Sequence, residues 1–187
     1  MIVSRSSENA SIEDSLSPWA GLRDLSQCCD WFFRIDHLRE LLIRNEILFH
    51  RDVIMCCGKY PITLIPIDLL RPHEETEASR LIELRNDILS RRVLEKPILV
   101  DLNTMIILDG HHRYRVLRDL GKKRIPSLLI DYNDSCVEVS SWRSDWVVSK
   151  DLVLRSGLSG KLLPHKTSRH KLCFEVPVIN LSIDDIP

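Results

Sequence analysis

The sequence lacks a long apolar run. One of its longest, Ile106 to Leu108, is far too short to cross a bilayer. The first ten residues also lack the basic stretch followed by an apolar stretch that marks a secretory signal. We therefore expect no membrane association and a cytoplasmic location. The length of 187 residues is enough for one domain with a buried core.

A marked net charge is also missing, because 26 basic residues face 27 acidic ones. This balance argues against binding to nucleic acid as a general polyanion. The positive charge is nevertheless concentrated in two short segments. Residues 111–130 hold six basic groups and one acidic group, and residues 155–171 hold five basic groups and no acidic group. This concentration indicates a compact anionic ligand.

The cysteines lack the spacing of a zinc site, in which two residues separate the paired thiolates. They lie at positions 28, 29, 56, 57, 136 and 173, so two of the pairs are vicinal. Vicinal disulfides are rare, and without a secretory signal reduced thiols are the ordinary state. We therefore expect structural or incidental cysteines in the reduced form.

Two regions differ in pattern along the chain. Residues 1–60 are interpreted as an N-terminal extension that is partly helical, with an amphipathic pattern from Trp31 to Phe49. Residues 61–187 are interpreted as the main domain, an α+β (mixed α/β) fold in which a mixed sheet has flanking helices. Strands are expected at 62–67, 97–102, 105–108, 125–132, 136–142 and 172–176, and helices at 76–92, 111–120 and 149–158.

The motif from Asp109 to Arg113 carries the strongest chemical signal. A strand ends there, turns at Gly110 and opens a helix, whose first N–H groups and dipole favour an anion. His111, His112 and Arg113 add side-chain donors, so phosphate is the expected occupant. Asp109 could bind Mg²⁺ or orient a hydroxyl group. A capped helix with solvated polar residues and a zinc site at the two histidines remain as alternatives.

Two loops and one tryptophan complete the set of candidate residues. In the loop 71–75, Glu74 could act on a substrate with His73 as its partner, whereas Glu75 and Glu77 could simply complement a helix dipole. Trp142 could border a small pocket or pack in the core. The acid-free loop 160–170 could wrap phosphate oxygens or a carboxylate, or could be a solvated basic turn. Its donors are Lys166, Thr167, Ser168, Arg169 and His170.

Together these motifs resemble the free serine kinases of the ParB/sulfiredoxin-like superfamily, among them the archaeal ADP-dependent serine kinase and the SbnI-type enzyme. The resemblance covers roughly two thirds of the chain, from residue 61 onward. Asp-Gly-His-His-Arg is widespread in the superfamily, and its combination with the other two loops is more specific. The matching stretches are Arg71–Glu74, Asp109–Arg113, Leu120–Pro126, Asp131–Tyr132, Trp142 and Pro164–His170.

The resemblance implies transfer of a phosphoryl group from ADP or ATP, with Mg²⁺, to the hydroxyl of free L-serine. It implies that Glu74 is the catalytic carboxylate and that Asp109 assists at the metal. The phosphates would be bound by Gly110, His111, His112, Arg113, Lys166 and Thr167. The serine would be bound by His73, Trp142, Ser168, Arg169 and His170.

The chain departs from the family pattern at two places. The archaeal enzyme has a long insertion between the Trp-bearing strand and the Lys-Thr loop, where this chain has about two dozen residues. Residues 1–60 could replace part of it or mediate a homodimer. Ser168 stands where the family has a second Thr.

The main alternative function is a ParB-like nucleotide-binding regulatory or partition-type module without kinase activity. Two further alternatives are a regulator that responds to haem or a metabolite and a nuclease that uses Glu74 and Asp109.

Overall fold

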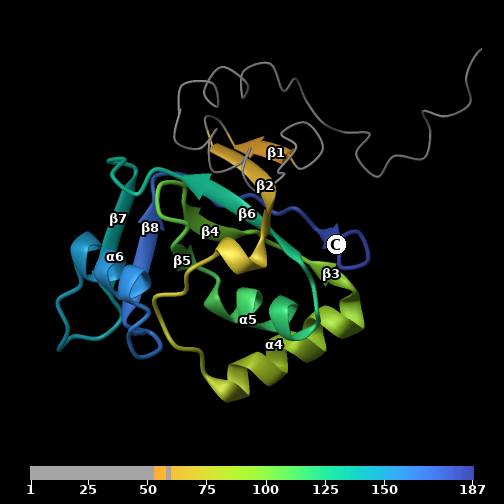
Figure 1. Ribbon diagram of the computed structural model, residues 1–187, viewed down its shortest axis with the longest axis horizontal. Helices are drawn as coiled ribbons and strands as arrows, with labels where there is room; N and C mark the ends of the chain where they lie inside the picture. Colours follow the sequence, from red (N-terminus) through yellow and green to blue (C-terminus); the bar gives the residue numbers. More distant parts are fainter. Residues whose placement is uncertain (1–52, 58–59) are drawn as a thin grey trace, which may run out of the picture.

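The structure is a computed structural model that describes residues 53–57 and 60–187. The helix expected from Trp31 to Phe49 lies outside these residues. A five-stranded mixed sheet organises the fold, with the order β1-β2-β6-β4-β5 (Figure 1). Its strands are β1 (Val53–Cys57), β2 (Tyr60–Pro66), β4 (Ile98–Asp101), β5 (Ile107–Asp109) and β6 (Arg124–Ile130). Strands β4 and β6 are parallel, and the other neighbours are antiparallel.

The core lies around the three central strands, because their residues are apolar with little alternation. All of β4 is buried, as are six of the seven residues of β6, which is typical of strands covered on both faces. Helices α4 (Ala78–Arg91) and α5 (His111–Asp119) pack together on one face of the sheet (Figure 1). Helix α6 (Lys150–Ser159) lies beside the paired strands β7 (Val137–Ser141) and β8 (Ser168–Leu172).

The expectation of a mixed sheet with flanking helices is confirmed, and most elements lie where the sequence predicts them. Ser149 caps α6, since its side chain accepts a hydrogen bond from Leu152 N at 3.2 Å. Helix α4 begins two residues later than the predicted helix at 76–92, with Glu77 at its N-cap. Ile82 is 63% exposed and lies on its outer side. The residues that face the core are Leu81, Leu84 and Ile88, at the expected helical spacing.

The last predicted strand, at 172–176, is wrong in position. Strand β8 occupies Ser168–Leu172, within the segment interpreted as a loop. Its residues alternate between buried and exposed, but the inward members are polar, so the hydrophobic pattern of a strand is absent from the sequence. The short strands β3 (Val93–Leu94) and β9 (Leu181–Ser182) and the 3-10 helix η1 (Ile67–Leu69) were not predicted.

The sheet begins before the expected domain boundary, because β1 lies within residues 1–60 and pairs with β2. The division into an extension and a main domain otherwise stays a prediction. Among residues 53–57 and 60–187, none of the helices combines the length and apolar character needed to pass through a bilayer.

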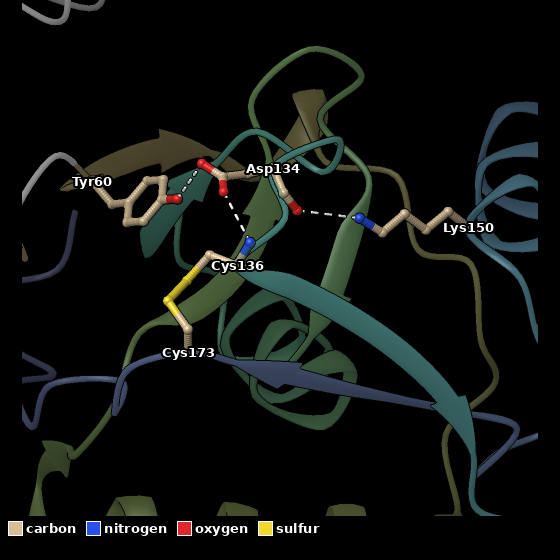
Figure 2. The surroundings of a disulfide bond; sticks show 5 residues. All are labelled: Tyr60, Asp134, Cys136, Lys150 and Cys173. Carbon is tan, nitrogen blue, oxygen red and sulfur yellow. Dashed lines mark hydrogen bonds between the residues drawn. A yellow bond between two sulfur atoms is a disulfide. The ribbon is translucent and has the colours of Figure 1, made fainter.

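A disulfide joins Cys136 and Cys173, so the expectation of reduced thiols is wrong for this pair (Figure 2). The two cysteines extend the β7–β8 ladder by one step beyond the pair Val137 and Leu172. Their Cα atoms are 5.0 Å apart, and Cys173 N donates to Cys136 O at 3.1 Å. The two cysteines are 37 residues apart, and no local pattern in the sequence indicates that they would face each other.

The double replacement Cys136→Ser and Cys173→Ser is expected to lower the free energy of unfolding by about 2–4 kcal/mol, because the unfolded chain loses a cross-link. Denaturant titration of both proteins, with and without a dithiol reductant, measures this change. The reductant should destabilise the wild type and leave the double variant unaffected. An equal effect of the reductant on both proteins would contradict the assignment of the stabilising cross-link to this pair.

Candidate functional site

The loop that leads from η1 to α4 is fastened on both sides by backbone hydrogen bonds. Ile107 N donates to Arg71 O at 2.9 Å, which ties the start of the loop to β5. Leu163 N donates to His73 O at 2.9 Å, which ties its middle to the segment before β8. The loop therefore holds His73 and Glu74 at a fixed place between β5 and β8.

His73 is completely buried, and both of its ring nitrogens have partners. Nδ1 lies 2.6 Å from Ile107 O, and a carbonyl oxygen can only accept, so Nδ1 carries the proton. Nε2 lies 2.8 Å from Ser168 Oγ. Burial is the main cause that lowers the pKa of His73, while the hydrogen bond to Ile107 and the nearby carboxylates oppose it. The ring is therefore neutral near pH 7.

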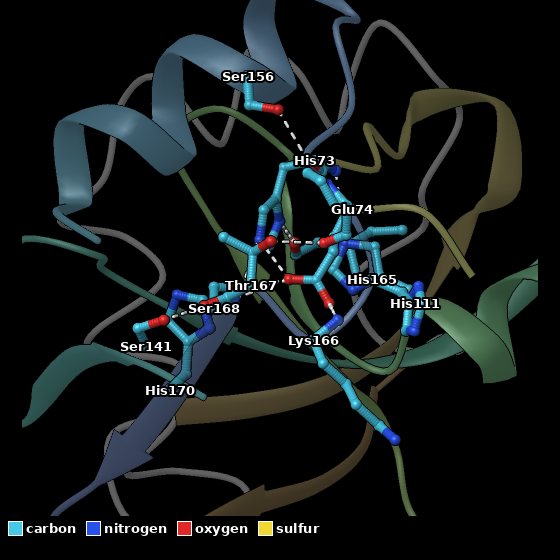
Figure 3. Close-up of polar contacts among 12 residues, drawn as sticks. His73, Glu74, His111, Ser141, Ser156, His165, Lys166, Thr167, Ser168 and His170 are labelled. Atoms are coloured by element: carbon cyan, nitrogen blue, oxygen red, sulfur yellow. Dashed lines mark hydrogen bonds and ion pairs between the residues drawn. The ribbon is translucent and has the colours of Figure 1, made fainter. Parts of the chain in front are cut away.

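The Glu74 carboxylate accepts three hydrogen bonds from the segment 166–168 (Figure 3). Oε1 accepts from Lys166 N at 2.7 Å. Oε2 accepts from Ser168 N at 2.9 Å and contacts Ser168 Oγ at 2.8 Å. Lys166 has a positive φ of 56°, and this turn brings two N–H groups to the same carboxylate. The side chain of Glu74 is only 11% exposed, so the segment covers most of it.

Two histidines at the start of α5 accept hydrogen bonds from backbone N–H groups. His111 Nε2 accepts from His73 N at 3.3 Å, and His112 Nε2 accepts from Glu77 N at 3.1 Å. Burial lowers the pKa of His111 well below its usual value and also lowers the pKa of His112. Both rings are thus neutral, and these nitrogens act as acceptors rather than as the donors that the sequence suggested.

His170 on β8 also lies beside His73, and their ring centroids are 5.9 Å apart. Tyr132 OH and His170 Nε2 are 2.8 Å apart. Burial, followed by the neighbouring His73, lowers the pKa of His170 to about 3. Burial also raises the pKa of Tyr132 above its usual value. Tyr132 OH therefore donates to a neutral His170 ring.

At the start of α5, Gly110 adopts a positive φ of 95° that few other residues tolerate. The Arg113 guanidinium donates to Asp109 Oδ2 at 2.8 Å and to the backbone oxygens of Lys96 and Pro97. Arg113 is therefore held against the protein. The first-turn N–H groups of α5 are the remaining donors of the motif, because such groups have no acceptor within a helix.

Asp109 is the candidate ligand for a divalent cation. Its side chain is 66% exposed and pairs with Arg113, so a carboxylate oxygen is accessible for Mg²⁺, which often binds through one or two carboxylates plus substrate phosphates. In the part of the chain that the structure describes, there is no cluster of three or more His, Cys, Asp or Glu that could hold a metal ion. The chain alone thus offers a partial site.

The other sequence candidates lie at the end of the β7–β8 pair that is remote from the disulfide. Thr167 is buried, and its hydroxyl donates to Pro164 O at 2.6 Å. Trp142 is 58% exposed, and the Arg169 guanidinium lies 4.4 Å from its ring centroid. The structure therefore separates buried candidates, grouped around His73 and Glu74, from the exposed pair of Trp142 and Arg169.

Three residues that support this arrangement received no role from the sequence. Tyr132 fixes His170, and Ser141 Oγ donates to Thr167 O at 3.1 Å. Ser156 Oγ, on α6, lies 2.8 Å from His73 O. Only Tyr132 had a signal, since it belongs to a stretch shared with the free serine kinases. The two serines have no local pattern that marks them.

Comparison with known proteins places the chain near serine kinases and ParB-like proteins. It is 38% identical over 111 residues to a ParB-like protein of Sulfolobus acidocaldarius, covering 56% of this chain and 54% of that protein. It is 39% identical over 83 residues to an ATP-dependent L-serine kinase of Staphylothermus marinus, covering 42% and 33%. It is 32% identical over 88 residues to an ADP-dependent L-serine kinase of Thermococcus kodakarensis, covering 45% and 36%.

The resemblance to the free serine kinases is confirmed. In solved structures, a glutamate-to-glutamine variant of a free serine kinase bound to AMP matches with a TM-score of 0.63 and 16% identity, over 67% of this chain and 94% of that one. The chain therefore shares its fold with this free serine kinase. The chain matches about half the length of the first curated relative and about a third of the others. No protein-family model matches it.

Gly110→Ala is expected to lower the free energy of unfolding by about 2–4 kcal/mol, through an unfavourable positive φ and a steric clash. A Cβ atom at residue 110 would lie 2.6 Å from Ile98 Cγ2. Gly121→Ala is the matched control, because residue 121 also has a positive φ but no atom within 4 Å of the added Cβ. Denaturant titration should give a smaller loss, about 1–2 kcal/mol, for this control. Equal losses would exclude the clash at Ile98.

Acidification is expected to destabilise the fold through His170. Its pKa is about 3 in the folded protein and about 6.5 when unfolded, so the unfolded chain binds the extra proton between these values. The contribution of His170 to the free energy of unfolding is complete above pH 6.5. It is lost as the pH falls toward 3, by at most about 1.4 kcal/mol per pH unit. His170→Asn should therefore flatten the measured decline, whereas His165→Asn, at a side chain that is 43% exposed, should not.

Proposed function

We propose that the protein transfers a phosphoryl group from ADP or ATP to the hydroxyl of free L-serine and gives O-phospho-L-serine. The observation that carries this proposal is the Glu74 carboxylate, almost buried among backbone donors next to neutral histidines and close to a helix N-terminus. The similarity to L-serine kinases of Staphylothermus marinus and Thermococcus kodakarensis supports L-serine as the substrate. Phosphoryl transfer suits such a site, since positioning and charge neutralisation supply most of its catalysis.

In this mechanism Glu74 accepts the proton of the serine hydroxyl. Among the residues that the structure describes, its Oε1 accepts one hydrogen bond, from Lys166 N, and a carboxylate oxygen can accept more than one. The serine oxygen attacks the terminal phosphorus of the nucleotide while the bond to the leaving phosphate oxygen breaks. The neutral state of His73 and His111 keeps competing positive charge away from the carboxylate.

The nucleotide phosphates are assigned to the start of α5 and to the loop before β8. Gly110 and the first-turn N–H groups of His111, His112 and Arg113 supply donors and the positive end of a helix dipole. The Lys166 side chain is 69% exposed with Nζ 3.8 Å from Glu77 Oε2, so it is available to phosphate oxygens. Thr167 orders this loop. The solved kinase complex with AMP supports binding of an adenine nucleotide.

Mg²⁺ is assigned to Asp109, whose exposed carboxylate stands beside the proposed phosphate site. The ion would neutralise phosphate charge when bound. Bound serine is assigned to the exposed pair of Trp142 and Arg169, and the inner residues His73, Ser168 and His170 are assigned to the inner wall of this site, where His73 is buried and acts through its neighbours. The Arg169 guanidinium is suited to the amino acid carboxylate because it offers paired donors.

A ParB-like nucleotide-binding module without kinase activity is the second candidate, because the relative from Sulfolobus acidocaldarius carries the name ParB-like. We further propose a cytoplasmic location, little affinity for nucleic acid, and a homodimer in which residues 1–60 take part. Residues 1–60 as an extension and 61–187 as the kinase domain complete this proposal.

The deciding experiment incubates the full chain with L-serine, Mg²⁺ and either ADP or ATP and follows phosphoserine by mass. Glu74→Gln is expected to lower the rate about 100-fold or more while nucleotide binding, measured by calorimetry, stays nearly unchanged. Glu75→Gln is the matched control, since this neighbouring side chain is exposed and should not affect the rate.

Three outcomes are informative. Phosphoserine with the wild type and a large loss in Glu74→Gln alone support the proposal. Nucleotide binding without phosphoserine from either donor would favour the ParB-like module. Loss of nucleotide binding in Glu74→Gln would contradict the role of this carboxylate in proton transfer.

A further inference from the structure

The Ser168 hydroxyl lies between two inward-facing groups that compete for its proton (Figure 3). Its Oγ is 2.8 Å from His73 Nε2 and 2.8 Å from Glu74 Oε2. A hydroxyl group has one proton, so it can donate to only one of these acceptors at a time. The two hydrogen bonds cannot both form while Glu74 is ionised and His73 is neutral.

The protonation of His73 is determined by its surroundings. Ile107 O holds the ring proton on Nδ1, at 2.6 Å, so that Nε2 of the neutral ring is an acceptor. Burial favours this neutral form by lowering the pKa of His73. The charged and titratable groups around the ring are Glu74 in the same loop, Asp109 at the end of β5, His111 on α5 and His170 on β8.

The better of the two acceptors depends on the charge of Glu74. An ionised carboxylate is a stronger acceptor than a neutral imidazole, because charge-assisted hydrogen bonds are stronger. In that state the Ser168 proton points to Glu74 Oε2, and His73 Nε2 lacks a donor from this hydroxyl. Once Glu74 has taken a proton it is neutral, and the imidazole nitrogen becomes the better acceptor.

We propose that the Ser168 hydroxyl is a switch that turns from Glu74 to His73 when Glu74 accepts the proton of the substrate hydroxyl. This inference rests on the proposed function. The serine oxygen forms its bond to phosphorus, the bond from phosphorus to the leaving nucleotide oxygen breaks, and the substrate proton goes to Glu74. Ser168 keeps its own proton throughout, and His73 stays neutral.

The hydrogen bond to His73 forms only in the state that follows proton transfer, so His73 stabilises that state alone. Before transfer, one of the two contacts of Ser168 Oγ lacks a proton. After transfer, the hydroxyl donates to His73 while the neutral carboxyl no longer needs it. Such a difference between the two states accelerates a reaction, whereas equal stabilisation of both does not. His73 is thus a positioning residue that acts on Glu74 through Ser168.

The first test uses nitrogen NMR of the histidine rings and needs no turnover. Glu74→Gln carries a neutral side chain and reproduces the state after proton transfer. The expected result is a shift of the His73 Nε2 resonance to lower frequency in Glu74→Gln relative to the wild type, as a bare nitrogen gains a hydrogen bond. In Ser168→Ala the Glu74→Gln replacement should produce no such shift. An unchanged His73 resonance in Glu74→Gln would overturn the proposal.

The second test compares the steady-state rates of Ser168→Ala and Ser168→Thr. Loss of the hydroxyl should lower kcat about tenfold or more with little change in the KM for nucleotide, and Ser168→Thr should restore most of the lost rate. Equal kcat values for the two variants would contradict the switch. If the wild type makes no phosphoserine, the kinase proposal fails, while the NMR comparison still decides whether the hydroxyl turns.

Discussion

The arrangement of the site depends on the hydrogen bonds that the Glu74 carboxylate needs because it is largely shielded from water. An ionised group as little exposed as Glu74 requires donors that replace its hydration. The segment 166–168 supplies them from more than 90 positions away in the sequence. The left-handed backbone of Lys166 and the placement of Ser168 next to His73 serve this requirement. The β7–β8 pair is thereby joined to the loop that follows η1.

The electrostatic character of the site differs from the one that the charge count suggests. Much of the positive charge in residues 111–130 is used within the fold. Arg113 binds Asp109 and backbone oxygens, Arg115 pairs with Asp119, and Lys122 donates to Ile186 O. The buried histidines add no charge, because burial keeps them neutral. Backbone N–H groups and exposed side chains such as Lys166 therefore remain as the means of attracting an anion.

The sequence predicts the parts of this fold that depend on local patterns. Gly110, Gly121 and Ser149 mark helix ends where the structure has them, and the apolar runs locate the central strands. Strand β8 was misplaced because its inward side chains are polar and its pairing is long-range. The resemblance to the free serine kinases predicts that Glu74, Asp109 and the loop before β8 belong to one site. The direction of each hydrogen bond, such as acceptance by His111 Nε2, depends on burial and could not be inferred from the sequence.

The disulfide makes the two ends of the β7–β8 pair mechanically unequal. At one end Cys136 and Cys173 are covalently linked, whereas the other end is held by hydrogen bonds, among them those from Ser141 Oγ to Thr167 O and from Arg143 to His165 O. Hydrogen bonds open and re-form, whereas the covalent link does not. The exposed pair of Trp142 and Arg169 lies at the hydrogen-bonded end, so its position depends on how the Glu74 carboxylate holds the segment 166–168.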